Sequence, residues 1–245
     1  MPAALHFLDL SLDSPAANLA LDEALLDHCE NGEGPAHGVL RCWETPAYFV
    51  VVGYGNRVTT EVDEAACDQA GVGIFRRCSG GGTVLQGPGC LNYALVLPLE
   101  ETGPLASITG ANEFIMRRNR DAVAALVEQS VSVAGHTDLT LAGRKFSGNS
   151  QRRRRRFLLF HGTFLLNFDL GLVERVLRSP SREPAYREGR RHTEFLANLP
   201  VGAAELRAAL RRAWGAALDF ANPPVALARE MAVTRYATDV WNFRL

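Results

Sequence analysis

Residues 73–98 read GIFRRCSGGGTVLQGPGCLNYALVLP, and this stretch decides how the chain is expected to fold. Its beginning, Gly73 to Arg77, and its end, Leu91 to Leu97, have the apolar composition of buried β-strands. Between them lie three consecutive glycines, which let a backbone approach a ligand closely and expose its amide donors. The stretch therefore predicts two strands with a glycine loop between them, and the loop is either a ligand-binding loop or a mobile turn.

Further strands and helices are predicted on both sides of this stretch. Apolar runs indicate strands at Val39 to Trp43, Ala47 to Gly53 and Phe157 to Phe168, and a hairpin at Leu139 to Ser147 that turns at Gly143. Helical spacing of apolar residues indicates helices at Asn18 to Cys29, Val62 to Ala70, Ala111 to Gln129, Leu170 to Leu177 and Ala203 to Phe220. Strands and helices do not alternate strictly, so the predicted class is α/β (α+β) with a mixed, largely antiparallel sheet flanked by helices.

Composition narrows the classes of function. The chain has 245 residues, of which 47% are hydrophobic, and a formal net charge of -1, which gives no reason to expect nucleic acid or an anionic membrane as partner. No apolar run reaches the roughly 20 residues that span a bilayer. The first residues include Asp9 and lack the basic start of a signal peptide. These features predict a cytoplasmic protein.

The cysteines give no sign of a metal or disulfide framework. They are Cys29, Cys42, Cys67, Cys78 and Cys90. Their number is odd, their spacing is scattered, and no Cys-x-x-Cys pair occurs, so neither zinc nor a set of disulfides is indicated. We expect small buried thiols.

Lys145 is the only lysine among 26 lysines and arginines. A mutational bias that replaces lysine elsewhere suggests that arginine cannot serve at this position, because a compact ammonium and a planar guanidinium differ in shape and reach. Survival by chance is an equally weighted alternative. Lys145 also lies between Gly143 and Gly148, which favour tight turns and access for a ligand.

Two other polar segments allow more than one interpretation. Arg76 and Arg77 precede the triple glycine and are able to bind phosphate or carboxylate, but they are equally expected beside a mobile surface turn. The run Arg152 to Arg156 is read first as a solvated loop and second as a docking surface for an acidic partner or phosphates. Neither a P-loop nor a dinucleotide-binding fingerprint is present.

His161 and Gly162 interrupt an apolar strand. An interior glycine suggests close approach of a ligand or another backbone. The histidine is read as a structural residue in preference to a catalytic base. No Gly-x-Ser-x-Gly elbow occurs, so the sequence gives no case for a Ser/His/Asp triad.

Taken in chain order, these segments resemble the lipoate-protein ligase A family, within the superfamily of biotin/lipoate ligases and octanoyltransferases. The segments that carry the resemblance are Asn18 to Glu23, Arg76 to Leu85, Leu91 to Tyr93, Asp138-Leu139, Gly143 to Lys145, Ser147-Gly148, His161 to Thr163, Leu165 to Asn167 and Trp241 to Phe243. Each is short, but the ordered set extends from about residue 8 to residue 245.

The resemblance implies one catalytic domain over residues 1–245 with the biotin/lipoate-ligase fold, without the C-terminal accessory domain of the larger ligases. It implies that the carboxylate of lipoate or octanoate attacks the α-phosphate of ATP, with Mg²⁺ assisting. A lysine of a lipoyl domain (2-oxoacid dehydrogenase E2) or of the glycine-cleavage H protein then takes the acyl group. Need for a separate accessory subunit, or transfer from pre-formed lipoyl-AMP only, remains open.

The same resemblance implies roles for individual residues. Lys145 is expected to be the catalytic residue that contacts both the acyl carbonyl and the α-phosphate. The nucleotide or acyl-adenylate is expected at Arg77, Gly82, Thr83, Val84, Leu85, Asp138 and Lys145. Lipoate is expected at Ser79, Gly80, Gly81, Asn92, Ser147, Gly148, His161 and Gly162. Asp138 is expected either to bind Mg²⁺ or to orient Lys145.

Three alternatives compete with a ligase. An octanoyl or lipoyl transferase would move the acyl group between carrier proteins through a cysteine thioester without ATP. Such relatives place their cysteine just before the lysine motif or in a later loop, where this chain has Gly135 to Asp138 and Ser179 to Tyr186. Cys78 and Cys90 lie nearer the expected pocket. A biotin ligase would have a different glycine loop, and a catalytically silent carrier-binding protein would keep the pocket alone.

Overall fold

The computed structural model describes residues 4–180 and 182–245, and these residues form two β-sheets. The larger sheet contains, in spatial order, β11 (Leu218–Asp219), β1 (His6–Asp9), β2 (Val39–Trp43), β6 (Cys90–Pro98), β10 (Phe157–Leu165), β9 (Arg144–Arg153), β8 (Asp138–Leu141) and β7 (Val131–Ala134). Strand β1 runs parallel to β11 and β2, and the other pairs are antiparallel. The prediction of a mixed, largely antiparallel sheet is confirmed.

The smaller sheet carries the glycine loop. Its order is β4 (Gly73–Arg76), β3 (Phe49–Val52) and β5 (Val84–Gln86). Strand β3 is parallel to β4 and antiparallel to β5, and all its residues are buried. The loop from Arg77 to Thr83 therefore connects the two edge strands, β4 and β5. Both ends of the loop are held against β3, because both edge strands pair with it.

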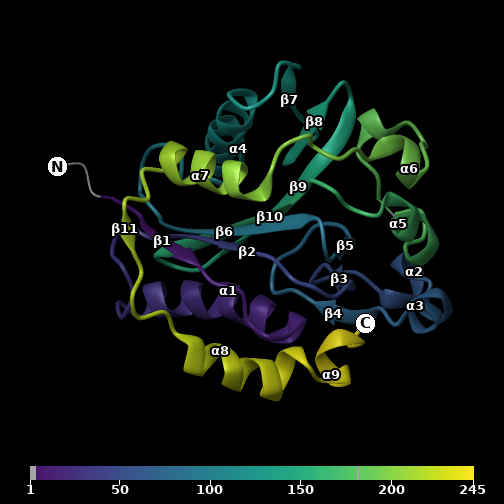
Figure 1. Cartoon of the computed structure of the whole chain (residues 1–245). Coiled ribbons are helices and arrows are strands. Elements are labelled where there is room, and N and C mark those ends of the chain that lie inside the picture. Colours follow the sequence, from purple (N-terminus) through teal and green to yellow (C-terminus); the bar gives the residue numbers. More distant parts are fainter. Residues whose placement is uncertain (1–3, 181) are drawn as a thin grey trace.

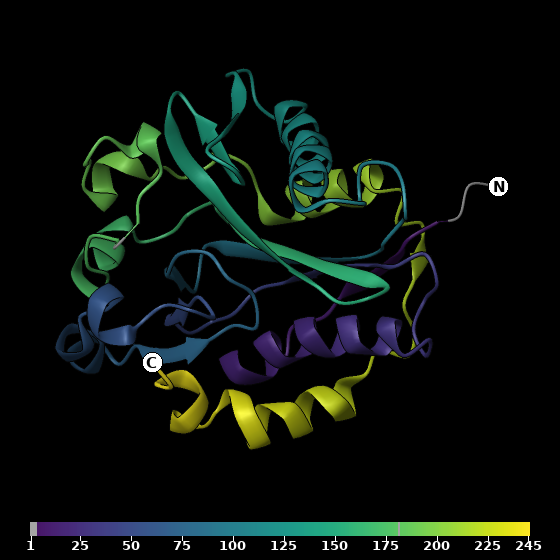
Figure 2. The same ribbon diagram turned by 180° about the vertical axis from the view of Figure 1, so that it is seen from behind.

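Helices cover both faces of the larger sheet (Figures 1 and 2). One core lies beneath α4 (Ile108–Ala124) and α7 (Ala203–Ala213), and another beneath α1 (Pro15–Glu30) and α8 (Val225–Met231). Helix α1 begins sharply because the side chain of Ser14 accepts a hydrogen bond from Ala17 N–H and Pro15 occupies the first turn. The remaining helical segments are α2 (Val58–Glu61), α3 (Glu64–Ala70), α5 (Leu170–Val176), the 3₁₀ turn η1 (Ala185–Arg187), α6 (His192–Phe195), the π-helical η2 (Ala232–Tyr236) and α9 (Asp239–Asn242).

The register of the central strands decides which side chains meet. Residues paired across neighbouring strands point to the same face of a sheet. One such row consists of Trp43, Asn92, Thr163, Gly148 and Asp138. The next row on this face consists of Arg41, Ala94, His161 and Ser150. Both rows face α1, so the polar residues of four or more strands converge on one side.

Several predicted elements differ from the observed ones at their ends. The helix predicted to run to Phe220 ends at Ala213, because Gly215 has a φ of 58° and the chain then pairs with β1 as β11. The single helix predicted from Val62 to Ala70 is instead α3, which starts after the N-cap Asp63, preceded by the separate α2. Four short strands were not predicted, namely β1 and the edge strands β11 and β7 of the larger sheet and β5 of the smaller sheet.

The arginine run forms a clamp on α1 and is not a free loop. Arg154 pairs with Asp27 at 2.8 Å. The carboxylate of Glu30 accepts backbone hydrogen bonds from the turn that ends at Phe157. Arg152 lies at the end of β9 and donates to the carbonyl of Cys78 at 2.8 Å. The run therefore joins the β9–β10 turn to the C-terminal end of α1. Arg155 and Arg156 at the turn are exposed, as the solvated-loop interpretation expected, whereas docking of an acidic partner or phosphates stays a prediction.

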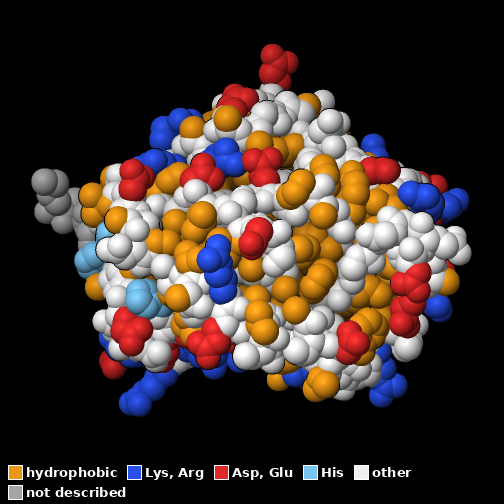
Figure 3. All heavy atoms as spheres, turned by 60° about the horizontal axis from the view of Figure 1, so that its bottom comes forward, with side chains coloured by type: hydrophobic (Ala, Val, Ile, Leu, Met, Phe, Trp, Pro, Cys, Tyr) orange, Lys and Arg blue, Asp and Glu red, His pale blue; other side chains and the backbone are white. Residues whose placement is uncertain are grey.

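The outer face of the C-terminal helices is apolar in places. No helix in the described ranges is long and apolar enough to cross a bilayer. On the side that carries α8 and α9, hydrophobic side chains lie between scattered charges (Figure 3). Val233 and Val240, in η2 and α9, are among the most exposed large hydrophobic residues.

Arg41 is a fully buried cation in the α1 core. Its guanidinium pairs with Asp22 at 2.6 Å, with side-chain exposures of 0% and 3%. It also donates to the side chain of Asn18 at 2.6 Å and to the carbonyl of Leu10 at 3.0 Å. Burial lowers the pKa of Arg41, while Asp22 opposes that shift by favouring the charged form. The pair joins β2 to α1.

We expect Arg41→Ala to lower the free energy of unfolding by about 3–5 kcal/mol, because it leaves the Asp22 carboxylate buried without its cation. Urea denaturation measures the change. Arg155→Ala, at an exposed position of the arginine run, is the matched control and should change stability by less than about 0.5 kcal/mol. Equal effects of the two substitutions would contradict this account of the core.

Candidate functional site

A cavity of about 300 Å³ lies between the α1 face of the larger sheet and the smaller sheet. Its walls come from α1, both sheets and the segment from α5 to α6. Predicted site residues that line it are Arg77, Gly81, Gly82, Thr83, Val84, Leu85, Asn92, Asp138, Lys145, Ser147, Gly148, His161 and Gly162. Ser79 and Gly80 lie in the adjoining loop. The ordered motifs of the sequence thus converge on one cavity.

Lys145 reaches this cavity from the start of β9. A β-bulge between β8 and β9 leaves Phe146 buried in the opposite core, where its ring stacks on Phe164. The ammonium of Lys145 lies 2.8 Å from Asp138 Oδ1, and 22% of the lysine side chain is exposed. A Cβ atom at Gly148 would lie 2.7 Å from Lys145 Nζ. Gly148 therefore provides the space that the ammonium occupies.

Both carboxylate oxygens of Asp138 have a partner. Its Oδ2 accepts a hydrogen bond of 2.7 Å from the hydroxyl of Tyr186, while Oδ1 faces Lys145. Tyr186 comes from the 3₁₀ turn η1 and was not predicted as a site residue. A single aromatic residue in an arginine-rich loop gave no signal for this role.

The glycine loop is shaped by Arg77. Its buried guanidinium donates to the carbonyls of Gly80 and Gly82, the latter at 2.7 Å. Burial lowers the pKa of Arg77 to about 10. Gly81 has a φ of 82°, a conformation that a residue with a side chain rarely adopts. The glycine loop thus curves around the guanidinium of Arg77 at the edge of the cavity.

Arg76 serves the fold and does not face a ligand. Its guanidinium donates to the carbonyls of Gly53 at 2.8 Å and Asn242 at 2.8 Å. Its backbone N–H donates to Asn242 Oδ1 at 2.9 Å, and Trp241 Nε1 donates to its carbonyl at 2.9 Å. The interpretation that both arginines of the pair meet phosphate was therefore wrong for Arg76, whose donors bind the C-terminal segment.

A chain of polar contacts ties the glycine loop to α1. Ser79 Oγ and His161 Nε2 are 2.5 Å apart, and His161 Nδ1 lies 3.1 Å from Asp22 Oδ2. The order Asp, His, Ser is that of a hydrolase triad, but Ser79 is 1% exposed and does not line the cavity. The contacts favour the structural interpretation of His161, which positions the loop relative to the sheet.

At the end of the cavity away from Lys145, hydrogen-bonded polar side chains lie among apolar ones. Thr163 donates to Asn92 Oδ1 at 2.8 Å and accepts from Gln86 Nε2 at 2.9 Å. Trp43 closes the row, and Leu19 and Val51 also line this region. The cavity therefore runs from a cation at Lys145 to an indole ring, along one row of paired strand positions.

Ser147 and Gly162 turn away from this row. The hydroxyl of Ser147 accepts from Asn149 Nδ2 at 3.2 Å, and a Cβ at Gly162 would lie 1.8 Å from Asn149 Oδ1. Asn149 also donates to the carbonyl of Thr137 at 2.7 Å and accepts from Tyr93 at 2.6 Å. The glycine in β10 thus makes room for a neighbouring side chain that supports the wall of the cavity.

The described residues do not supply a protein cage for Mg²⁺. No group of three or more His, Cys, Asp or Glu side chains comes together among them. Both oxygens of Asp138 are already engaged. A magnesium ion that arrives with a nucleotide keeps waters and phosphates as most of its ligands. The contacts of Asp138 favour its role in orienting Lys145.

The mouth of the cavity is basic, a feature that the sequence reading did not assign. The cavity lining includes Arg178 and Arg182, which are exposed and form this mouth, and Arg187 and His192, which are buried. Arg178 donates to the carbonyl of Val62 at 3.0 Å, and Arg187 lies 3.6 Å from Glu183. The three arginines add to the positive charge of Lys145, which suits an anionic ligand. Burial lowers the pKa of His192 and so favours its neutral form.

All five cysteines are buried, and none is among the described residues that line the cavity. Burial raises the pKa of Cys78 to about 11 and that of Cys42 to about 12. The expectation of small buried thiols is confirmed. A thiol with a raised pKa is a poor nucleophile near neutral pH, because only the thiolate attacks.

The chain is similar in sequence to a known protein family and to proteins of other organisms. The profile described as "Lipoyl protein ligase A/B catalytic domain" matches residues 14–205. The chain is 26% identical to octanoyltransferase LipM of Brevibacillus brevis, over 94% of this chain and 95% of that protein. It is 28% identical to lipoate-protein ligase A subunit 1 of Thermoplasma acidophilum, over 96% of each.

Solved structures share the fold. The bipartite lipoate protein ligase of Thermoplasma acidophilum, from a study that includes its E2 lipoyl domain, superposes with a TM-score of 0.81 at 23% identity, over 98% of this chain and 96% of that one. A lipoate-protein ligase A bound with ATP gives a TM-score of 0.80 at 24% identity, over 98% of both chains. The biotin/lipoate-ligase type of fold expected from the sequence is confirmed.

We expect the native protein to react slowly with a thiol reagent at pH 8. Each unit by which a thiol pKa exceeds its usual value lowers the thiolate fraction about tenfold, and burial blocks access as well. Unfolding in guanidinium should release all five thiols. The absorbance of the released chromophore counts the reacting groups. One thiol that reacts at once in the native protein would reveal an activated cysteine and contradict this description.

Proposed function

This chain belongs to the lipoyl protein ligase A/B catalytic domain family, and from that premise we propose that it attaches a lipoyl or octanoyl group to a lysine of a lipoyl domain by way of an acyl-adenylate made from ATP. The observation that carries the proposal is the ammonium of Lys145, held by Asp138 in the cavity. The absence of cysteine from the described lining residues supports adenylate chemistry over a thioester.

The acyl chain fits the row of paired positions between Gly148 and Trp43. This row crosses three strand spacings, or about 14 Å. The distance suits an extended lipoyl group whose carboxyl end lies at Lys145. Leu19 and Val51 supply apolar contacts along the row.

Lys145 is the proposed catalytic residue of both steps. When the acyl carboxylate attacks the α-phosphate, and again when an acceptor amine attacks the acyl carbonyl, negative charge develops on oxygens. A fixed ammonium stabilises that charge in a water-poor cavity. Asp138 is a positioning residue in this scheme, because it contacts the ammonium.

The nucleotide is proposed to lie between the glycine loop and the basic mouth. The backbone from Gly82 to Leu85 lines one side, and Arg178 and Arg182 line the other. Backbone amides and guanidinium groups are suitable donors for phosphate oxygens. Mg²⁺ bound to the phosphates would help pyrophosphate to leave.

The proposed acceptor is a lipoyl domain of a 2-oxoacid dehydrogenase or the glycine-cleavage H protein. One structural neighbour is described as a bipartite ligase with its E2 lipoyl domain, and one relative as a ligase subunit. Those descriptions support a lipoyl-domain acceptor and a separate accessory subunit for this chain.

A second candidate is ATP-independent octanoyl transfer between carrier proteins. Relatives described as octanoyltransferase LipM favour it, since they match nearly their whole length at 26–28% identity. The two candidates are separated by supplying either lipoate with ATP or an octanoyl-carrier protein without ATP, and by weighing the lipoyl domain afterwards. Efficient ATP-free transfer that is lost in Cys78→Ser or Cys90→Ser would replace the ligase proposal.

We expect Lys145→Arg to keep the fold and to lower kcat for acylation of the lipoyl domain by about 100- to 1000-fold, as loss of a well-placed charge donor does. The broader guanidinium does not fit the space at Gly148 that the ammonium occupies. Mass spectrometry of the acceptor measures the rate, and circular dichroism reports the fold.

Arg155→Lys is the matched control for this substitution. It exchanges the same two residue types in the opposite direction at an exposed position, and its activity should equal that of the wild type. If Lys145→Arg acylates the acceptor at a near-normal rate, then Lys145 is not the catalytic residue.

A further inference from the structure

Tyr186, Asp138 and Lys145 form a chain of hydrogen bonds that ends in the cavity. Tyr186 donates to Asp138 Oδ2 at 2.7 Å, and Asp138 Oδ1 lies 2.8 Å from Lys145 Nζ. The terminal torsion of an aspartate is broad, so one contact alone leaves its carboxylate free to rotate. Contacts at both oxygens fix the plane of the carboxylate and therefore the position of the ammonium.

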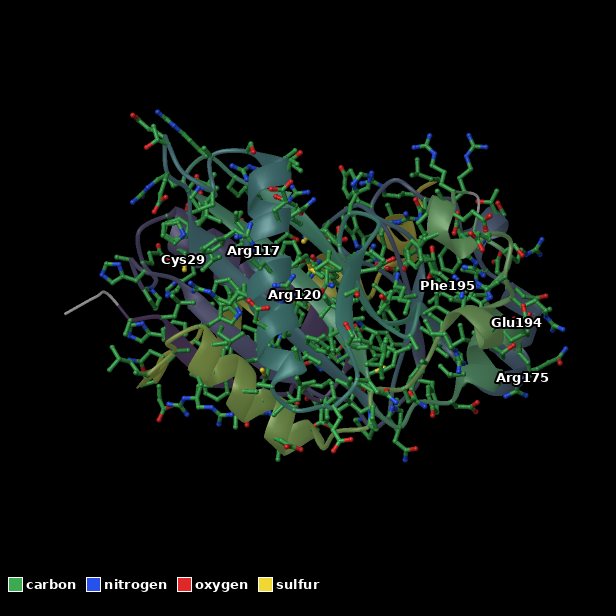
Figure 4. The ribbon with its side chains drawn as sticks, turned by 90° about the horizontal axis from the view of Figure 1, so that it is seen from above. Cys29, Arg117, Arg120, Arg175, Glu194 and Phe195 are labelled. Carbon is green, nitrogen blue, oxygen red and sulfur yellow. The ribbon has the colours of Figure 1, made fainter. Side chains whose placement is uncertain are left out.

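Tyr186 is itself held firmly. Its ring packs on Phe195 with the centroids 5.2 Å apart, and its carbonyl accepts from Arg190 Nη2 at 2.6 Å. In Figure 4 Phe195 points inward from α6, whereas the neighbouring Glu194 points outward. Burial, with a further contribution from Asp138, raises the pKa of the Tyr186 hydroxyl, which keeps it protonated as a donor.

The proposed reaction places Lys145 in a chemical conflict. The activated acyl group is attacked by the amine of an acceptor lysine, and Lys145 carries the same functional group beside the same carbonyl carbon. If Lys145 reacted, its nitrogen would form an amide with the acyl carbon while the bond from that carbon to the phosphate oxygen broke. AMP would leave, and the former ammonium would release two protons to solvent. The catalytic cation would be lost.

We propose that Tyr186 and Asp138 protect Lys145 from acylation by the enzyme's own product of activation. The proposal rests on the proposed function, because it needs an activated acyl group in the cavity. An ammonium whose protons are held by a carboxylate has no lone pair with which to attack. Tyr186 is the positioning residue that keeps the carboxylate turned toward Lys145, and Lys145 is the latent modification site.

Other contacts hold the surrounding segment, so removing the hydroxyl should leave the fold intact. The N–H of Ala197 donates to the carbonyl of Lys145 at 2.9 Å, and Arg144 donates to the carbonyl of Thr193 at 3.0 Å. Neither contact involves the hydroxyl of Tyr186. Tyr186→Phe therefore isolates the hydrogen bond to Asp138.

The first experiment incubates the full chain with ATP, Mg²⁺ and lipoate in the absence of an acceptor. Because Lys145 is the only lysine, an acylated side-chain amine found by peptide mapping identifies this site. We expect Tyr186→Phe to acylate itself about fivefold faster than the wild type, the factor that corresponds to one hydrogen bond. Asp138→Asn should do so too, and adding Tyr186→Phe to Asp138→Asn should have no further effect.

The second experiment needs no enzymatic activity. A water-soluble N-hydroxysuccinimide ester of acetate is added, and the rate of acetylation at Lys145 is followed by mass. We expect the same order, with Tyr186→Phe and Asp138→Asn faster than the wild type. Tyr48→Phe, which removes a hydroxyl from a residue outside the cavity lining, should match the wild type.

These two measurements separate the possible failures. If the wild type forms no acyl-adenylate but both substitutions speed acetylation of Lys145, the protective contacts stand and the proposed function fails. An acetylation rate in Tyr186→Phe equal to that of the wild type and of Tyr48→Phe would overturn the protective role, even if the ligase activity is present. Additive effects of Tyr186→Phe and Asp138→Asn would also overturn it, since they would show that Tyr186 does not act through Asp138.

Discussion

Two adjacent buried carboxylates on α1, Asp22 and Glu23, are the constraint on which the rest of the structure depends. An ionised carboxylate in a protein core is strongly destabilising unless cations and hydrogen-bond donors surround it. Asp22 is met by Arg41 from β2 and by His161 from β10. Glu23 accepts from Tyr236 at 2.5 Å and pairs with Arg235. One helix thereby fixes two strands and the C-terminal segment relative to each other.

The central strands and the fold class were predictable because they depend on the composition of short, continuous segments. The apolar composition of the segments that became β2, β6 and β10 is enough to identify strands. Their register was not readable, because it depends on pairings such as Trp43 with Asn92 and Thr163 with Gly148. The edge strand β11 was missed for the same reason, since its two residues become a strand only by pairing with β1.

At the site too, residues within short motifs were predictable, whereas residues that act through distant contacts were not. The glycine loop and Lys145 stand out as motifs, and both line the cavity. Tyr186 does not, because its role exists only through a contact with Asp138, 48 residues away in the chain. Likewise, the choice between an adenylate and a thioester depends on which side chains face the cavity, and the fold that the two kinds of enzyme share does not decide it.

The contact between Arg76 and the C-terminal segment has a consequence for biosynthesis. Asn242 and Trp241 bind Arg76 at the base of the glycine loop, across a separation of 166 residues from Arg76 to Asn242. A ribosome makes the glycine loop long before it makes these partners. The nascent chain is therefore able to form the strands early, while the base of the loop gains these contacts only after Trp241 and Asn242 have emerged.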